Sequence, residues 1–141
     1  MILPIVLFGS SILRKKCVVV KNFDDELISL IDNMWETMYA AHGVGLAAPQ
    51  INKNLRLFIV DTSPFFEKEN DSRSVKKVFI NPQIIEETGD EWVFNEGCLS
   101  IPELREDISR KSSIKIEYLD QDFNMTVDHF NGVNARVIQH E

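Results

Sequence analysis

The sequence predicts an α+β fold, because two helical patterns flank a series of strand patterns. The first helical pattern covers about residues 24–41, and the second opens at Asn131-Gly132. Between them, residues 114–127 have the alternation and the central turn of a β-hairpin. We therefore expect antiparallel strands around a C-terminal helix, with the N-terminal helix packed on the sheets. The length of 141 residues predicts a single domain.

Composition and charge describe an ordinary globular protein and exclude several classes. Apolar residues make up 44% of the chain and charged residues 26%. A net charge of −7 argues against strong electrostatic binding to a nucleic-acid backbone, so no direct nucleic-acid site is expected. No apolar run approaches the length of a membrane helix, and no signal peptide is evident. Two cysteines do not make a disulfide scaffold, and we expect a cytoplasmic protein.

The first helix has the clearest pattern in the chain. Three acidic residues, Asp24 to Glu26, lie where the helix dipole favours negative charge. Apolar residues then recur at helical spacing and form one stripe, which we assign to the core: Leu27, Ile31, Met34 and Met38. Gly43 follows the last turn and is the predicted C-cap.

The strand patterns are shorter and are separated by turn residues. We expect extended structure at 17–20, strands at 55–60 and 78–80, and shorter strands at 84–85 and 92–94. A turn is expected at 8–11 and a surface loop at 62–77. Asn81-Pro82 is predicted to break one strand, and Gly89-Asp90 to form a turn between two others. The final helix, capped by Asn131, would contain His140 and Glu141.

Three stretches carry candidate chemistry, although each also has an ordinary structural explanation. Gly43 and Gly45 would let another backbone approach as an added strand, or would serve only a helix end and a tight turn. Gln50 offers an amide donor for an oxyanion or for a loop. Cys98, in Glu96-Gly97-Cys98-Leu99-Ser100, is a possible ligand or nucleophile beside a glycine. His140-Glu141 at the end of the sequence is a weak signal by itself.

Together the three stretches resemble the motifs of peptide deformylases. That family carries Gly-x-Gly-Leu-Ala-Ala-x-Gln, Glu-Gly-Cys-x-Ser and Gln-His-Glu-x-x-His in this order. The sequence matches the first motif at 43–50 and the second at 96–100, and it matches the third at 139–141 only. Residues 34–39, 80–82 and 101–102 also resemble family members, so the resemblance covers nearly the whole chain.

The resemblance implies a function and a cofactor. Deformylases remove the formyl group from the N-terminal formyl-methionine of newly made proteins, and they use one divalent metal. Iron(II) is the native metal of the family, with zinc or nickel as substitutes. Cys98 and His140 match metal ligands, and Glu141 matches the general base. The backbone N–H of Leu99 and the side chain of Gln50 match the groups that stabilise the oxyanion.

The resemblance also implies the substrate groove and the partners. Gly43, Val44 and Gly45 would line one side of the groove, and Glu103 and Arg105 would lie near the outer end of the other side. The partners would be nascent formyl-methionyl peptides and, through a C-terminal extension, the ribosome. His42 and His129 match no family role.

The third motif stops before its second histidine, so we expect the C-terminal helix to be incomplete over residues 1–141. The chain could be a fragment of a longer active enzyme, a naturally shortened protein, or one completed by a symmetry partner. Two other functions stay open. One is a weakly active or inactive peptide-binding domain that keeps the groove around Val44. The other is a cysteine hydrolase with Cys98 as nucleophile and His140 as its base.

Overall fold

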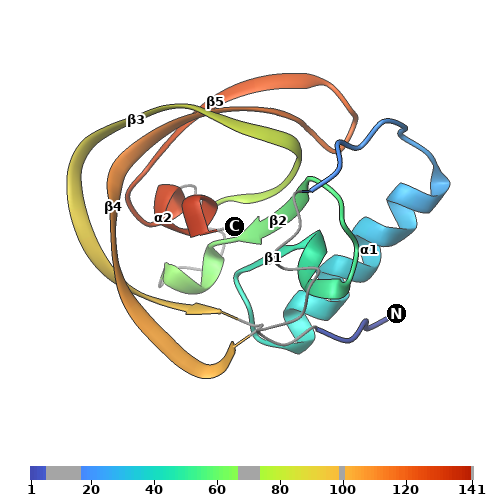
Figure 1. The fold of residues 1–141 in the computed structure, drawn as a ribbon, viewed down its shortest axis with the longest axis horizontal. Helices are drawn as coiled ribbons and strands as arrows, with labels where there is room; N and C mark the ends of the chain where they lie inside the picture. Colours follow the sequence, from blue (N-terminus) through green and yellow to red (C-terminus); the bar gives the residue numbers. More distant parts are fainter. Residues whose placement is uncertain (6–16, 67–73, 99–100, 141) are drawn as a thin grey trace.

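A computed structural model describes residues 1–5, 17–66, 74–98 and 101–140; for residues 90–98, 101–111, 133, 136 and 140 it describes the backbone only. Within these described residues there are two α-helices and five strands (Figure 1). The helices are α1 (Asp25–Ala40) and α2 (Gly132–His140), and two short 3-10 helices are η2 (Ala48–Ile51) and η3 (Ser63–Phe65). The strands are β1 (Gly45–Ala47), β2 (Leu57–Asp61), β3 (Lys76–Cys98), β4 (Ile101–Leu119) and β5 (Met125–Asn131).

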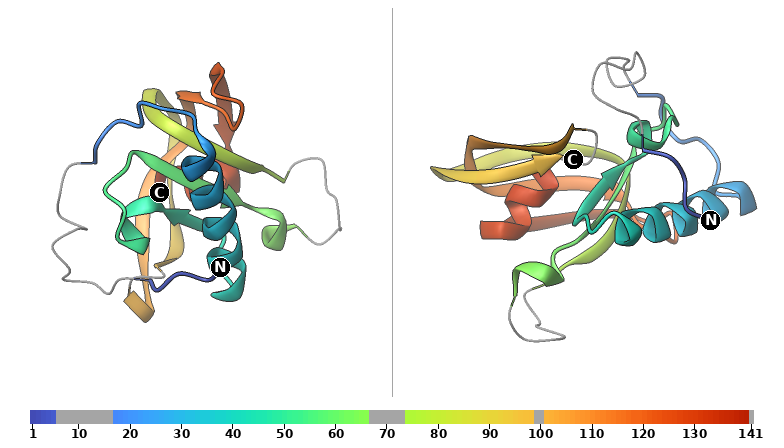
Figure 2. Two further views of the ribbon diagram at one scale, coloured as in Figure 1. Left: turned by 90° about the vertical axis from the view of Figure 1, so that its right-hand side faces the viewer. Right: turned by 90° about the horizontal axis from the view of Figure 1, so that it is seen from below.

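The five strands form one antiparallel sheet in the order β1-β2-β3-β4-β5. The long strands β3 and β4 curve strongly, and α2 lies inside that curve, whereas α1 lies beside β1 and β2 (Figures 1 and 2). The expected α+β fold, with antiparallel strands around a C-terminal helix, is confirmed.

Strand β2 separates two apolar clusters. Leu57 and Ile59 belong to the cluster that α1 covers, and Phe58 and Val60 belong to the cluster that contains α2. Successive side chains of a strand point to opposite faces, so both faces of β2 are buried. This explains why Leu57–Val60 is a continuous apolar run and not an alternating one.

Helix α1 begins as predicted, with the Asp24 side chain accepting a hydrogen bond from the Leu27 N–H at 2.9 Å. Its end differs from the prediction. His42, with φ of 57°, takes the left-handed position that the sequence predicts for Gly43. The Gly43 N–H bonds to the Met38 carbonyl and the His42 N–H to the Tyr39 carbonyl, which is the Schellman arrangement. Histidine tolerates positive φ better than most residues, so His42 has a structural role here.

The predicted strand break at Asn81-Pro82 is wrong. Strand β3 runs through it and pairs with β4 along its length, with shifts in register after Ile80, Ile84 and Thr88. A bulge accommodates the proline, which has no N–H to donate. Asn81, with φ of 51°, uses its side chain to bond both the N–H and the C=O of Val20. The short strands expected at 84–85 and 92–94 are therefore parts of one strand.

Other predictions fare unevenly. The hairpin is confirmed, with β4 and β5 joined by a turn at Asp120–Asn124. The extended segment at 17–20 makes one parallel bridge, Val18 to Leu55, and Val18 and Val19 are about half exposed. The loop predicted at 62–77 is wrong at both ends, because Thr62 is buried and β3 starts at Lys76. The turn at 8–11 lies outside the described residues.

Phe79 is the centre of the apolar cluster around α2. Its side chain is fully buried, and its ring lies 4.7 Å from the Phe58 ring and 4.4 Å from the Tyr118 ring, centroid to centroid. The Phe130 ring meets it edge-on at 5.9 Å. One ring from β3 thus joins β2, β4 and β5.

Replacing Phe79 with alanine should therefore lower the free energy of unfolding by about 3–5 kcal/mol, because the cavity cannot collapse among three other rings. Urea titration measures the change. Met125→Ala is the control: its side chain is 63% exposed, so a change within about 0.5 kcal/mol is expected. Equal effects of the two substitutions would contradict this description of the core.

Candidate active site

The segment Gly43–Gln50 forms one edge of the sheet. Gly45 pairs with Val60, and the Asp61 N–H bonds to the Val44 carbonyl at 2.8 Å. In an antiparallel ladder, bonded and non-bonded pairs alternate, so Gly45 is in a non-bonded pair and its N–H and C=O point to the outer edge of β1. An extended peptide could bond to Gly45 there as an added strand. The structure thus gives Gly43 the helix-end role and leaves the peptide-strand interpretation open for Gly45.

Gln50 lies at the end of this segment with its side chain 9% exposed. Its Oε1 accepts a hydrogen bond from the Ala47 N–H at 2.9 Å. Because an N–H can only donate, this bond fixes which end of the amide is oxygen. The amide NH2 is therefore turned away from Ala47. The Gln50 side-chain oxygen thus caps η2, which is the loop role that the sequence left open, and the oxyanion role stays a prediction.

Helix α2 packs against the same segment. Ala135, Val137 and Ile138 are buried in the cluster against which Val44 and Ala47 pack. The first motif and the helix that leads into the third, 89 residues apart from Gln50 to Gln139, therefore share one core cluster. His140 is the last residue of α2, and its side chain is not described. Glu141 lies outside the described residues.

The second motif ends β3. Cys98 is the last residue of that strand, and its backbone pairs with Ile101 at the start of β4. Arg105 of β4 pairs with Gly97 of β3. Glu103 lies between Ile101 and Arg105 along β4. Only the backbone of these residues is described, and Leu99 lies outside the described residues. The structure therefore places the backbones of Cys98, Glu103 and Arg105 at one end of the β3–β4 hairpin, without describing their side-chain contacts.

The donor set suits a transition metal. Cysteine thiolate and histidine imidazole are ligands that iron and zinc accept. Among the side chains that the structure describes, no group of three or more His, Cys, Asp or Glu residues could hold a metal ion. The described part of the chain thus offers no competing site, and Cys98 and His140 remain the candidate ligands. His42 and His129 are both exposed, and neither belongs to a described group of this kind.

Asp61, which sequence reasoning missed, supports the edge at Val44. Its carboxylate accepts hydrogen bonds from the Tyr39 hydroxyl at 2.6 Å and from the Ser63 N–H at 3.0 Å. Burial raises the pKa of Asp61, but these bonds and the positive charge of Lys76 outweigh it and hold the pKa below its usual value. Burial and the neighbouring Asp61 raise the pKa of Tyr39. The signal available in the sequence is an acidic residue at the end of a buried strand.

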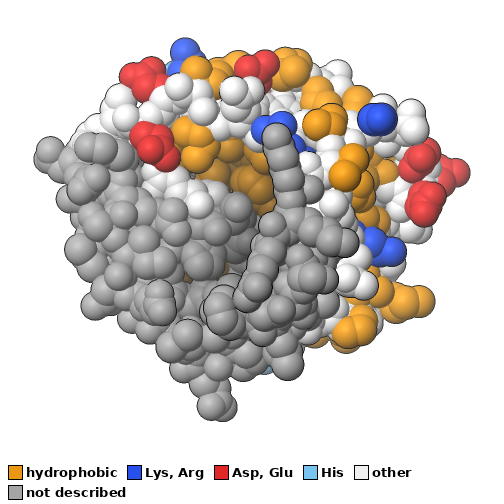
Figure 3. Space-filling model, in the orientation of Figure 1, with side chains coloured by type: hydrophobic (Ala, Val, Ile, Leu, Met, Phe, Trp, Pro, Cys, Tyr) orange, Lys and Arg blue, Asp and Glu red, His pale blue; other side chains and the backbone are white. Residues whose placement is uncertain are grey.

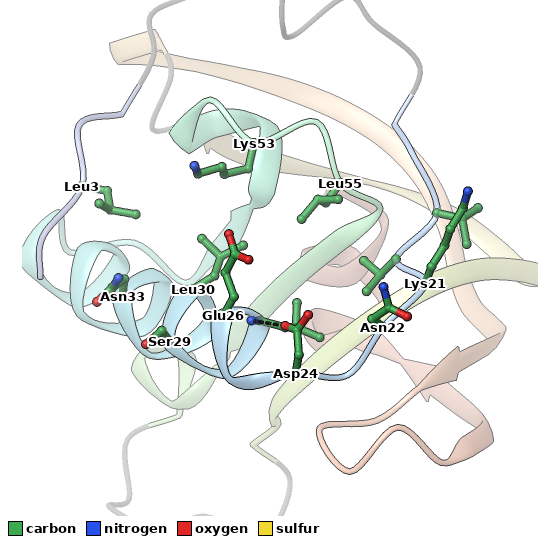
Figure 4. Close-up of a pocket in the computed structure, with 13 residues that line it drawn as sticks. Leu3, Lys21, Asn22, Asp24, Glu26, Ser29, Leu30, Asn33, Lys53 and Leu55 are labelled. Atoms are coloured by element: carbon green, nitrogen blue, oxygen red, sulfur yellow. Dashed lines mark hydrogen bonds between the residues drawn. The ribbon is translucent and has the colours of Figure 1, made fainter.

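A pocket of about 520 Å³ lies elsewhere, between α1 and the segments before and after it (Figure 4). Its labelled side chains include Leu3, Leu30 and Leu55, with charged groups of both signs at its rim. None of the predicted site residues lines it. Hydrophobic side chains also gather on the surface over the region of α1 and the segment before it (Figure 3). We find no helix in the described part of the chain that is long and apolar enough to cross a membrane.

The sequence model of a known family, described as polypeptide deformylase, matches residues 2–141. The chain belongs to the peptide deformylase family. A peptide deformylase of Christiangramia forsetii is 51% identical over an alignment that covers all of this chain and 76% of the relative. The peptide deformylase of Flavobacterium johnsoniae is 49% identical with the same coverage. The family resemblance drawn from the three motifs is thereby confirmed.

Solved deformylase structures have the same fold. The enzyme from Thermotoga maritima superimposes with a TM-score of 0.88 at 38% identity, covering all of this chain and 89% of that one. The enzyme from Synechococcus elongatus, solved in complex with actinonin, gives 0.88 at 36% identity, covering 99% of this chain and 71% of that one. This chain therefore has the deformylase fold, and its sequence carries the family motifs described above.

The Asp61 contacts predict how the stability of this deformylase depends on pH. A carboxyl whose pKa is lowered in the folded state stabilises the fold above its unfolded pKa of about 3.9, and this contribution is lost as the pH falls through the folded value. Between pH 5 and pH 2, the free energy of unfolding should fall less steeply for Asp61→Asn than for the unchanged chain. Tyr39→Phe, which removes one stabilising bond, should be intermediate. Urea titrations across this range measure the slopes, and identical slopes would contradict the assignment.

Proposed function

We propose that this chain is a metal-dependent hydrolase that removes the formyl group from the N-terminal formyl-methionine of newly made proteins. One observation carries the proposal: β1 is an edge strand in which the N–H and C=O of Gly45 are directed away from β2, and it leads into Gln50, whose side-chain oxygen accepts from the Ala47 N–H. A peptide bound along that edge would have its N-terminal end near an amide donor. Family membership supports the same chemistry.

Substrate binding would use the backbone of β1. A nascent peptide in extended form would donate to and accept from Gly45, and Gly43 and Val44 would line the same side of the groove. Glu103 and Arg105 would face it from β4 at the outer end. Backbone bonds do not depend on the side chains of the peptide, so such a site would accept many sequences after the methionine. Such peptides emerge from ribosomes, so we propose contact with the ribosome and a cytoplasmic location.

The reaction would add water to the formyl carbon and break its bond to the amine nitrogen, releasing formate. Gln50 and the Leu99 N–H would donate hydrogen bonds to the carbonyl oxygen as negative charge develops on it. Glu141 would take a proton from the attacking water and deliver it to the departing amine. Cys98 and His140 would hold a divalent metal, iron(II) or its substitutes zinc and nickel, which would supply Lewis-acid activation of the water.

Formate release from a formyl-methionyl peptide tests the proposal directly. The purified chain should release formate when iron(II), nickel or zinc is supplied, and a chelator should stop the reaction. Cys98→Ser should abolish it, because a hydroxyl is a much weaker ligand than a thiolate. No formate with any metal would contradict the proposal, and activity that survives chelation would favour a cysteine nucleophile. Binding of the peptide without turnover would favour an inactive binding domain.

Gln50→Glu is the sharpest change at the proposed oxyanion site. The carboxylate keeps an oxygen for the Ala47 N–H, so η2 should stay capped, but the amide donor is lost and negative charge is added. We expect kcat to fall by about a hundredfold or more, the usual cost of losing one oxyanion donor. Gln83→Glu, at an exposed position on β3, is the matched control and should leave kcat unchanged. An unaffected kcat in Gln50→Glu would remove Gln50 from the mechanism.

A further inference from the structure

Thr62, directly after β2, joins three separate parts of the chain. Its side chain is fully buried, and its hydroxyl oxygen accepts a hydrogen bond from the Val75 N–H at 2.8 Å. The same hydroxyl lies 2.7 Å from Oδ1 of Asn134 in α2. Because the Val75 N–H supplies its own hydrogen, the single hydroxyl hydrogen is free to go to Asn134. Thr62 thus links the end of β2, the residue before β3 and the first part of α2.

The residue before Thr62 holds the proposed peptide-binding edge. The Asp61 N–H bonds to the Val44 carbonyl at 2.8 Å, and the Thr62 N–H bonds to the Val75 carbonyl at 2.9 Å. Asp61 and Thr62 are therefore hydrogen-bonded to the two sides of the proposed site: Asp61 to Val44 on the substrate side, and Thr62 to Asn134 on the helix side. The two hydrogen bonds between Thr62 and Val75 hold the backbone at the end of β2 in place.

Helix α2 needs such a directional contact. Apolar burial of Ala135, Val137 and Ile138 holds α2 against the sheet, but burial alone is non-directional and permits rotation or sliding. A hydrogen bond weakens steeply away from linear geometry, so the one from Thr62 restricts the rotation of α2. Asn134 lies six residues before His140, about 9 Å along a helix. With nine residues in α2, a rotation at its beginning is carried to its end.

We propose that Thr62 is a positioning residue for deformylation: acting through Asn134, it sets α2, and with it His140, relative to the peptide-binding edge at Val44 and Gly45. This inference rests on the function proposed above for those residues. Thr62 touches neither substrate nor metal in this scheme. Its contribution is to keep the last turn of α2 in register with β1.

Thr62→Val keeps the volume and the branched shape of the side chain and removes only the hydroxyl. We expect kcat to fall about tenfold to a hundredfold, the scale on which misplacement of reacting groups costs rate, while KM stays nearly unchanged because the Asp61–Val44 bond persists. Zinc affinity, measured by competition with a chromophoric chelator, should fall about tenfold. Hydrogen exchange of the α2 amides should accelerate. Thr62→Ser, which restores the hydroxyl, should recover all three properties.

Thr37→Val is the matched control. Thr37 is also a buried threonine, 1% exposed, whose hydroxyl accepts from the Leu3 N–H at 2.8 Å and donates to the Asn33 carbonyl at 2.7 Å. It lies on α1, whose apolar residues belong to the cluster that does not contain α2. Thr37→Val should lower the thermal midpoint by an amount similar to Thr62→Val, yet leave kcat, zinc affinity and α2 exchange unchanged.

The outcomes separate positioning from general stability. If Thr62→Val and Thr37→Val change kcat, zinc affinity and α2 exchange alike, the inference is overturned. If Thr62→Val does not fold, Asn134→Ala removes the same bond from the helix side and must reproduce the loss of kcat and zinc affinity. If the unchanged chain releases no formate, the proposed function fails instead. Faster α2 exchange and weaker zinc binding in Thr62→Val alone would then still support the anchoring of α2, and their absence would overturn it.

Discussion

The burial of β2 on both faces is the constraint on which the rest of the structure depends. Leu57 and Ile59 require a cover on one side, which α1 supplies, and Phe58 and Val60 require one on the other, which includes α2. The edge that carries Gly45 is paired to β2, and the helix that ends at His140 packs on the opposite side of β2 from α1. Burial of one strand thus brings together segments that lie almost 90 residues apart.

Hydrogen bonds at the end of β2 fix how the packed elements are oriented relative to one another. Apolar contacts decide which surfaces meet, but hydrogen bonds at Asp61 and Thr62 decide how they are oriented. The Asp61 carboxylate also binds Tyr39 of α1, so the same two residues touch α1, the β1 edge and α2. A buried carboxylate is costly unless its bonds are satisfied, and here each oxygen has a donor.

The sequence is most informative where structure depends on near neighbours. The period of Leu27, Ile31 and Met34 and the acidic start at Asp24 are enough to place α1 within one residue at each end. Local signals mislead where pairing between distant segments prevails. Asn81-Pro82 has the composition of a strand break. Hydrogen bonds between Asn81 and Val20 and pairing with β4 nevertheless let β3 continue through these residues with a bulge. His42 replaces Gly43 as the left-handed residue because the cap depends on position as well as on residue type.

The candidate site divides in the same way. Residue types and their order, through their resemblance to the deformylase motifs, predict Gly43 to Gln50, Cys98 and His140 as site residues, and their roles stay predictions. The orientation of the Gln50 amide and the outward direction of Gly45 follow from bonds with Ala47 and from the register with β2, which no local pattern encodes. Local composition predicts that Thr62 lies in a surface loop. Its hydrogen-bond partner Asn134 lies 72 residues away, so the sequence around Thr62 carries no signal of its burial.

The shortness of β1 has a consequence for the fidelity of recognition. An exposed strand edge usually lets a partner slide by two residues and also invites pairing with another copy of the chain. Here the Ala47 N–H is occupied by Gln50, so within this three-residue strand Gly45 is left to offer both an N–H and a C=O outward. A ligand that shifted along this edge would lose both bonds at once. A peptide bound as proposed would therefore have a single alignment, and the edge is too short to seed growth of the sheet.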